Sequence, residues 1–326
     1  MNSFLQLQKC NFFKGIFHRF LILFLTLMII PELFSQQTTL ITQHMFTTMS
    51  YNPAFAGSSE GIAVTGLIRQ QYIGFKDEKG NSVFPQTYIF SADAPLKVLH
   101  GGLGGSVMLE KIGFFNFTYV KIGYDYRTDL GPGTFSAGIQ LDVNNTKIDP
   151  SQFTPEDQND GIITGLQKSD LVADFTLGVF YKVPDKYYIG LSADQVAQSK
   201  QKKIYYQDKR TFYLNGGYNW VIPGHPAFEI QPSALFRTDL TQFQFDISAL
   251  LMYNKKVWGG LGYRLQDAVS ILAGMSIKGI KIGLSYDLST SAMTKYNSGS
   301  LEVMLSYCFK VETEKFRKSY KNTRFL

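Results

Sequence analysis

The sequence predicts an all-β chain that crosses a membrane as an antiparallel up-and-down β-barrel of about 14 strands. Three observations support this. Many segments of about ten residues alternate apolar and polar side chains. The longest connections between these segments are all odd-numbered, and the charged residues of the segments lie on the face opposite the apolar residues. The composition agrees, because 27 Phe, 19 Tyr and 29 Gly suit twisted sheets at a lipid boundary. No apolar run after residue 36 is long enough for a spanning helix, which leaves a closed barrel.

The alternation has a period of two and is clearest over 134–144, 242–253 and 301–309. In the first of these segments Phe135, Ile139 and Val143 alternate with polar residues. An even number of strands returns the C-terminus to the side of the N-terminus. The segments that we expect to be strands are 61–72, 86–94, 101–110, 117–126, 134–144, 173–181, 187–193, 211–220, 228–237, 242–253, 256–263, 268–277, 280–287 and 300–309.

Connection lengths give an independent check on this count. With the N-terminus in the periplasm, odd-numbered connections face outward, and outer-membrane barrels have their longer loops there. The longest connections are all odd: 74–85, 145–172, 194–210 and 288–299. Even ones, such as 183–186, 254–255 and 278–279, are tight. A soluble β-sandwich would also alternate and is the alternative fold.

The charged residues of the expected strands lie opposite the most apolar face, which places them in the lumen of a barrel. Both signs occur, which predicts ion pairs across the lumen rather than a pathway for ions of one sign. These residues are Arg69, Asp93, Glu110, Lys121, Asp125, Asp142, Asp174, Glu229, Arg237, Asp246, Lys281, Asp287 and Glu302.

Residues 1–35 have the features of a secretory signal peptide. Basic residues from Lys9 to Arg19 precede an apolar run over 20–30, and we expect cleavage near Ser35. A retained amphipathic anchor helix is the alternative. Cys10 and Cys308 are the only cysteines, so the cleaved chain has one thiol and no intramolecular disulfide. Cys10 does not follow the small residues that lipoprotein processing requires, so we expect no lipid anchor.

The net charge of +6 is concentrated at the two ends of the chain. Residues 1–35 carry +2 and residues 310–326 carry +4, so that 36–309 are neutral. A neutral body offers no basic surface for nucleic acid, and we expect none as a partner. Residues 310–326 follow the last expected strand and are predicted to be a basic periplasmic tail, either with a partner or simply solvated.

The sequence shows no motif that would carry catalysis. His44, His100 and His225 lack metal-ligand spacing, and each is expected to be a solvated loop residue. Phosphate loops, dinucleotide fingerprints and nucleophile elbows are missing. Residues 149–161 hold enough oxygen ligands to bind calcium weakly but lack EF-hand spacing, so a solvated loop is the plainer interpretation. We therefore expect no catalytic residue, no cofactor, no metal site and no enzymatic activity.

The stretch SYNPAFAG, residues 50–57, reads as a turn, because Pro53 fixes φ and Gly57 tolerates positive φ. Together with four other stretches it resembles the PorP/SprF family of outer-membrane proteins, which is associated with type IX secretion and gliding motility in Bacteroidetes. The matching stretches are QHMFTTMSYNPAFAG (43–57), RQQYIGF (69–75), FPQTYIFSADAPL (84–96), GLGGSVMLEKIG (102–113) and NSGSLEVMLSYCF (297–309). The motif residues are Tyr51, Asn52, Pro53, Ala54, Gly57, Arg69, Gln70, Gln71, Pro85, Gln86, Thr87, Asn297, Ser298, Gly299 and Ser300.

This resemblance covers nearly the whole mature chain and departs from the family pattern at Tyr72, where Trp is common, and in the tail 310–326. It implies a cell outer-membrane barrel over 61–309, preceded by a periplasmic or plug segment, 36–60. We expect Asn52 and Pro53 to turn the chain at the periplasmic mouth. The side chains expected to pack there as a partial plug are those of Leu40, Ile41, Met45, Phe46 and Met49.

The function implied by the resemblance is non-enzymatic: to help a particular secreted protein or gliding-type adhesin reach or stay on the cell surface. Cargo would contact the outer loops 145–172 and 194–210, and the periplasmic face would meet a type IX secretion or peptidoglycan-linked partner. Two alternatives stay open. One is a diffusion channel, for example for hydrophobic compounds, and the other is a membrane-embedded hydrolase, for which no nucleophile with a base is found.

Overall fold

We describe a computed structural model of the chain over residues 39–59, 61–76, 80, 83–148, 168–204 and 207–310. The expected signal peptide with Ser35, the calcium-binding candidate 149–161 and the tail beyond Lys310 lie outside these residues. The strands are β1 Gly61–Gln70, β2 Gln86–Leu96, β3 Gly101–Ile112, β4 Phe115–Leu130, β5 Gly133–Ile148, β6 Lys168–Val183, β7 Tyr187–Asp194, β8 Thr211–Tyr218, β9 Trp220–Val221, β10 Phe228–Thr238, β11 Phe243–Tyr253, β12 Val257–Arg264, β13 Ala268–Ile277, β14 Ile280–Ser289 and β15 Ser300–Lys310. Short 3-10 turns are η1 His44–Phe46, η2 Thr48–Ser50, η3 Pro53–Phe55, η4 Lys97–Leu99 and η6 Ala292–Lys295.

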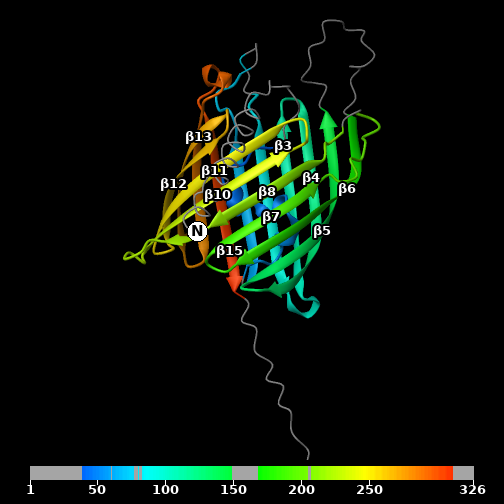
Figure 1. Cartoon of the computed structure of the whole chain (residues 1–326). Helices are drawn as coiled ribbons and strands as arrows, with labels where there is room; N and C mark the ends of the chain where they lie inside the picture. Colours follow the sequence, from blue (N-terminus) through cyan, green and yellow to red (C-terminus); the bar gives the residue numbers. More distant parts are fainter. Residues whose placement is uncertain are drawn as a thin grey trace, which may run out of the picture. The chain divides into compact units, whose positions relative to one another are not determined.

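The strands form one antiparallel sheet that closes on itself (Figure 1). Closure is made by β1 and β15, which pair along their full length from Gly61–Lys310 to Gln70–Leu301. β8 and β9 both pair with β10 and are two pieces of one wall strand, interrupted at Asn219. The wall therefore has 14 strand positions, and the predicted outer-membrane β-barrel is confirmed.

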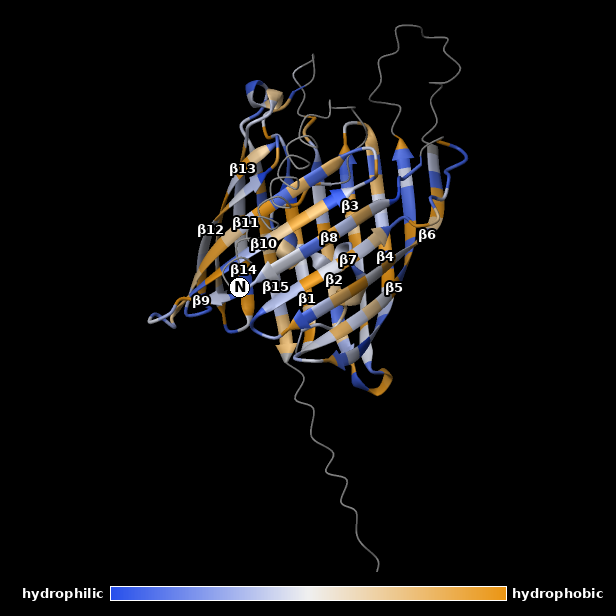
Figure 2. Ribbon diagram, viewed as in Figure 1, coloured by the Kyte–Doolittle hydropathy of each residue, from blue (hydrophilic) through white to orange (hydrophobic). Residues whose placement is uncertain are grey.

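Apolar and polar residues alternate along the strands (Figure 2). The apolar ones are exposed on the lipid face and the polar ones are buried in the lumen. Ile68, Ile122 and Leu261 are among the many exposed apolar residues of the strands, whereas Arg69 and Lys121, each one residue away in sequence, are buried. This inverts the burial pattern of a soluble protein, as expected when lipid replaces water outside. Of the thirteen charges predicted to face the lumen, all are buried except the half-buried Glu110 and the exposed Lys281.

The wall is higher on one side than on the other. β4, β5 and β6 each have 16 residues, whereas β7 and β8 have 8. The predicted outer loop 145–172 is therefore too long: its first and last residues belong to β5 and β6, which pair from Ile148–Lys168 onwards. Alternation did not reveal these ends, because residues beyond the lipid need no apolar face. β15 likewise extends to Lys310, one residue past the predicted limit. Within the described residues no helix is long and apolar enough to span a membrane.

Candidate functional site

Residues 39–59, which we call the plug, run through the lumen from its outer half to its periplasmic mouth. At the outer end, the Thr39 carbonyl accepts a hydrogen bond from Arg237 Nη1 at 2.8 Å. Arg237 is next to the outer end of β10. At the other end, the Gly57 N–H donates to Asp93 Oδ1 at 3.0 Å, and Asp93 lies near the periplasmic end of β2. The plug thus spans much of the lumen height, and its chain leaves at the mouth to begin β1.

The outer part of the plug is held by a cluster of buried charges that we call the latch: Arg69, Arg264, Asp287 and Glu302. Glu302 accepts hydrogen bonds from the N–H groups of Thr42 and Gln43, at 2.7 and 2.9 Å. Its Oε1 atom also binds Arg69 Nη1 at 2.6 Å. Arg69 and Glu302 are 1% and 0% exposed, so these charge-assisted bonds form away from bulk water.

The Thr42 hydroxyl lies at the centre of the latch. Asp287 is its acceptor, with oxygens at 2.7 and 2.8 Å. Arg69 and Arg264 donate to the same hydroxyl oxygen at 3.3 and 3.0 Å. Arg264 also pairs with Asp246, at 2.7 Å. Four wall strands, β1, β12, β14 and β15, thereby meet on one plug residue, and β11 is joined to them through the pair of Asp246 with Arg264.

Apolar plug side chains pack below the latch. Ile41, Met45 and Phe46 contact a small buried cluster in the lumen, and the ring centroids of Phe46 and Trp258 lie 5.8 Å apart. Leu40 and Met49 are buried. The five apolar residues expected in a plug all lie in the lumen; Ile41, Met45 and Phe46 are higher than the predicted periplasmic position, whereas Met49 packs against Gly104, near the periplasmic end of β3. The members of the wall cluster are Leu67, Ile89, Leu250, Trp258, Leu272 and Met304.

The motif around Asn52 nests against wall glycines. Asn52 caps η3 by accepting the Ala54 N–H at 3.0 Å, and its Nδ2 atom donates to the Val179 carbonyl at 3.2 Å. A Cβ at Gly178 would lie 2.2 Å from Asn52 Oδ1, and one at Gly138 would lie 2.7 Å from the plug backbone. The plug can approach this closely only because these positions have no side chain.

This nest changes one prediction. Asn52 and Pro53 were expected to turn the chain at the periplasmic mouth, but they lie inside the lumen, where the glycines leave room. Gly57 makes the turn at the mouth, with φ of +61° and with its carbonyl bonded to Arg127. Tyr51 stacks on Tyr213 of β8, with ring centroids 5.1 Å apart, and Ala54 is fully buried.

The remaining motif residues meet at the outer rim, where β1 and β15 close the barrel. The Ile73 N–H donates to the Gly299 carbonyl and the Ser298 N–H to the Ile73 carbonyl, both at 2.7 Å. The Ser300 hydroxyl accepts the Tyr72 N–H at 3.0 Å, and Asn297 caps this loop by accepting the Gly299 N–H. The 71–76 and 297–300 stretches therefore form a clasp over the seam.

This clasp is supported from the strand ends by four further motif residues, Gln70, Pro85, Gln86 and Thr87. The Gln71 N–H donates to the Pro85 carbonyl at 2.9 Å. Gln70 pairs with Gln86 across β1 and β2, and Thr87 lies opposite Arg69. Arg69 itself belongs to the latch, so one motif stretch serves both the seam and the plug. The sequence analysis named these residues as family motifs but did not predict that they contact one another.

A second charge cluster lies on the opposite wall, over β4 to β7. Lys121 Nζ is 2.7 Å from Asp194 Oδ2 and 3.9 Å from Asp142 Oδ2. The Thr176 hydroxyl lies between the two carboxylates, at 2.5 Å from Asp142 Oδ2 and 2.6 Å from Asp194 Oδ1. The two latch arginines and Lys121 are therefore each surrounded by carboxylates, which agrees with the prediction of ion pairs across the lumen.

His44 contradicts the sequence prediction. It was expected to be a solvated loop residue, but it is 2% exposed within the plug, and burial lowers its pKa to about 4. The negative charge of Asp246 raises the pKa of His44, while the positive charges of Arg264 and Arg237 lower it further. A neutral ring is therefore the folded form at neutral pH. His100 and His225 are exposed, as predicted.

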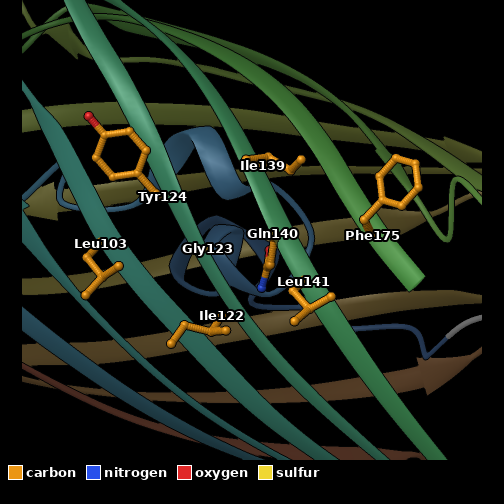
Figure 3. A pocket seen from close by; sticks show the side chains of 8 residues that line it. All are labelled: Leu103, Ile122, Gly123, Tyr124, Ile139, Gln140, Leu141 and Phe175. Atoms are coloured by element: carbon orange, nitrogen blue, oxygen red, sulfur yellow. The ribbon is translucent and has the colours of Figure 1, made fainter. Parts of the chain in front are cut away.

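The described residues contain no group of three or more His, Cys, Asp or Glu side chains able to hold a metal ion. The calcium prediction for 149–161 falls outside them. On the lipid face, a shallow hollow of about 390 Å³ lies over Gly123, on the other side of the wall from the plug (Figure 3). Its apolar rim suits an acyl chain of the surrounding membrane. The rim residues are Leu103, Ile122, Tyr124, Ile139, Leu141 and Phe175.

Comparison with known proteins decides the family. Residues 33–307 match the model of the type IX secretion system membrane protein PorP/SprF. The chain belongs to this family. Its place is therefore the cell outer membrane, as an outer-membrane component of type IX secretion with lipid and the secretion system around it. No curated protein sequence matches the chain.

Solved structures similar to this PorP/SprF protein are outer-membrane barrels. The toluene transporter TbuX of Ralstonia pickettii has a TM-score of 0.50 at 12% identity, over 80% of this chain and 92% of that one. The outer-membrane protein Omp33 of Acinetobacter baumannii has a TM-score of 0.45 at 9% identity, over 76% and 98%. The monoaromatic hydrocarbon channel CymD has a TM-score of 0.49 at 10% identity, over 86% of this chain and 96% of that one. At these identities the likeness concerns the fold alone.

Proposed function

We propose that this PorP/SprF protein supports the export or surface attachment of one specific secreted protein or gliding-type adhesin, without enzymatic activity. Family membership over residues 33–307 is the observation that carries the proposal. The plugged lumen supports a role as a docking platform, because its own chain and the charge clusters occupy the space that a large cargo would need.

The outer rim is the cargo surface in this proposal. Cargo contacts the loops predicted at 145–172 and 194–210. The described part of the second loop lies along the free edge of β6 and is tied to it. Asp174 accepts the N–H groups of Ala197 and Ser199 at 2.8 and 2.9 Å, and Asp170 accepts that of Lys203 at 2.6 Å. A loop held in this way is a defined surface on a rigid scaffold.

The periplasmic face meets the secretion machinery or a peptidoglycan-linked partner in the same proposal. The tail 310–326 carries the basic charge for this contact. A second contact point is the tip of the β2–β3 connection, where Val98 and Leu99 are 90% and 58% exposed. Exposed neighbouring apolar side chains of this kind suit a protein or membrane surface.

The second candidate function is a diffusion channel for hydrophobic compounds. It is favoured by the fold that the chain shares with TbuX, whose name describes a toluene transporter. The latch argues against it, because buried charged side chains of four wall strands hold the plug by hydrogen bonds. A solute path would require these bonds to open.

Quantitative mass spectrometry of surface and medium proteins tests the proposal. Wild-type cells are compared with cells that lack the protein and with cells complemented by the Gly66→Ala variant. Gly66 faces lipid, and an added Cβ has 4.0 Å of room, so this variant should behave as wild type. Selective loss of one or two secreted proteins, with general secretion intact, supports the proposal. An unchanged secreted set contradicts it and favours the channel.

A further inference from the structure

The outer half of the lumen binds a polypeptide through its backbone. Glu302 binds two consecutive N–H groups, of Thr42 and Gln43, and Arg237 binds the carbonyl of Thr39. These interactions use atoms that every peptide segment has. A carboxylate and a guanidinium placed to bind N–H and C=O groups of one short segment are the elements of a peptide-binding site.

Side-chain contacts add selectivity to this backbone recognition. The Thr42 hydroxyl meets both Asp287 and the two latch arginines. Phe46 packs on Trp258, and Met45 on the same apolar cluster. A Cβ at Gly283 would lie 2.3 Å from Gln43 Oε1, so the wall is also shaped for the segment at this point. The site therefore recognises a hydroxyl residue followed, four residues later, by a ring.

The charges around the site define which segments it accepts. Within hydrogen-bonding distance of Thr42 and its partners, the wall has two guanidinium groups and four carboxylates, those of Asp246, Asp267, Asp287 and Glu302. The wall thus has an excess of negative charge. Residues 39–50 contain no acidic residue. An acidic residue at the position of Thr42 would meet Arg69 and Arg264, but four carboxylates already neutralise these two cations, so the net effect is repulsion by Asp287 and Glu302.

The segment occupies its site as a tethered ligand. It continues through the plug into β1, so its local concentration at the latch is in the range of millimolar or above. A separate peptide must exceed this concentration or bind better. A site that is filled by its own chain is consequently free for another segment only when the tethered one is released.

We propose that the outer half of the lumen is a peptide-binding site that takes a non-acidic segment of another polypeptide, folded like the turn and short 3-10 helix over 42–46, in place of residues 39–47. The ligand class is a stretch with Thr or Ser at the latch and an apolar or aromatic side chain four residues later. The outer rim, which the clasp of 71–76 with 297–300 borders, is where such a segment enters. This inference stands apart from the proposed function and is tested on purified protein.

The test uses the full chain carrying Thr42→Glu, which places a third carboxylate beside Asp287 and Glu302 and releases the tethered segment while the wall stays intact. A fluorescent peptide with the sequence of residues 39–50, TLITQHMFTTMS, is titrated in detergent and followed by anisotropy. Correct folding is verified by the heat-modifiable mobility of the barrel in gels. We expect saturable binding by the Thr42→Glu chain and at least about 10-fold weaker binding by the wild-type chain.

Two controls make the result specific to the latch. The double variant Thr42→Glu with Glu302→Gln should bind the peptide about 10-fold more weakly or worse, because the two charge-assisted bonds are lost. A peptide with Glu at the position of Thr42 should not bind. Equal binding of both peptides, equal binding by both variants, or no saturable binding by the folded Thr42→Glu chain would overturn the proposal.

A second measurement covers the case in which Thr42→Glu prevents folding. The wild-type chain is incubated with millimolar peptide that carries p-benzoylphenylalanine at the position of Phe46, and is then irradiated. Crosslinking to the strands around Trp258, suppressed by excess unlabelled peptide, supports the proposal. Crosslinks confined to other surfaces, or insensitive to the competitor, contradict it.

Discussion

The Glu302 carboxylate accepts the Thr42 N–H at 2.7 Å, which ties the first described turn of the plug to the strand that closes the barrel. Both groups are buried and lie 260 positions apart in sequence. The same carboxylate binds Arg69 of β1 and so joins the two strands of the seam. One side chain therefore contacts both the plug and the seam of the barrel.

Replacing Glu302 by Gln should loosen the outer plug. The amide cannot accept two N–H groups and a guanidinium with the strength of a carboxylate, so the amides of 39–47 should exchange hydrogen about 10-fold faster or more. Hydrogen exchange with mass spectrometry measures this. Glu229→Gln is the matched control, because Glu229 is also a buried lumenal carboxylate but pairs with Lys255 at the periplasmic end. Equal exchange in both variants would refute the role of the latch.

Gly178→Ala should destabilise the nest around Asn52. The new Cβ would lie 2.2 Å from Asn52 Oδ1, and relieving this overlap costs about 1–3 kcal/mol. The temperature at which the folded band disappears in semi-native gels should fall. Gly66→Ala, which places its Cβ 4.0 Å from the nearest atoms on the lipid side, should leave that temperature unchanged. A fall of the same size in both variants would show that sheet propensity, not the plug, is responsible.

His44 should make the plug sensitive to acid. Burial lowers its pKa from 6.5 to about 4 in the folded chain, so between these values the unfolded chain binds more protons. Stability therefore falls as the pH falls from about 6.5 towards 4. The His44→Phe variant has no imidazole and so lacks this loss of stability in acid. Any advantage of the wild-type chain in unfolding temperature should therefore narrow or reverse between pH 6.5 and pH 4. A difference that is independent of pH would contradict a neutral buried imidazole.

Lys121→Met should be severely destabilising. It removes the cation between Asp194 and Asp142, at 2.7 and 3.9 Å, and leaves buried carboxylates without their partner. Loss of one member of a buried pair costs about 3–5 kcal/mol. Lys255→Met is the control, because this side chain is 59% exposed, so that water screens its pairs with Asp185 and, at 3.6 Å, with Glu229, and its loss should cost much less. Similar yields and melting temperatures for the two folded variants would show that Lys121 has no special role.

The barrel could be predicted from the sequence because lipid on one side and polar side chains on the other impose a strict period of two. Strand ends such as Ile148 and Lys168 were missed, since beyond the lipid the alternation has no physical cause. Motif residues such as Asn52 and Arg69 were named from the family resemblance. Their partners Gly178 and Glu302 were not identified as such, because contacts over more than 100 positions leave no local pattern.

The path of the plug was the least predictable feature. The apolar residues from Leu40 to Met49 indicated that the segment packs somewhere, but their depth depends on wall glycines whose contact with it only the fold reveals. His44 was misjudged for the same reason, because a polar side chain in a segment without strand pattern reads as a solvated loop. Its burial follows from the lumen that surrounds it.

The proposed function requires a lumen that the plug closes, with secretion served from the outer rim. Conductance in planar lipid bilayers tests it most directly, by comparing the wild-type chain with the Glu302→Gln and Thr42→Glu variants. We expect little or no conductance for wild type and intermittent openings for both variants, as the outer plug is released. Large, steady conductance of the wild-type chain, unchanged in the variants, would show that the plug does not close the lumen and would favour the channel.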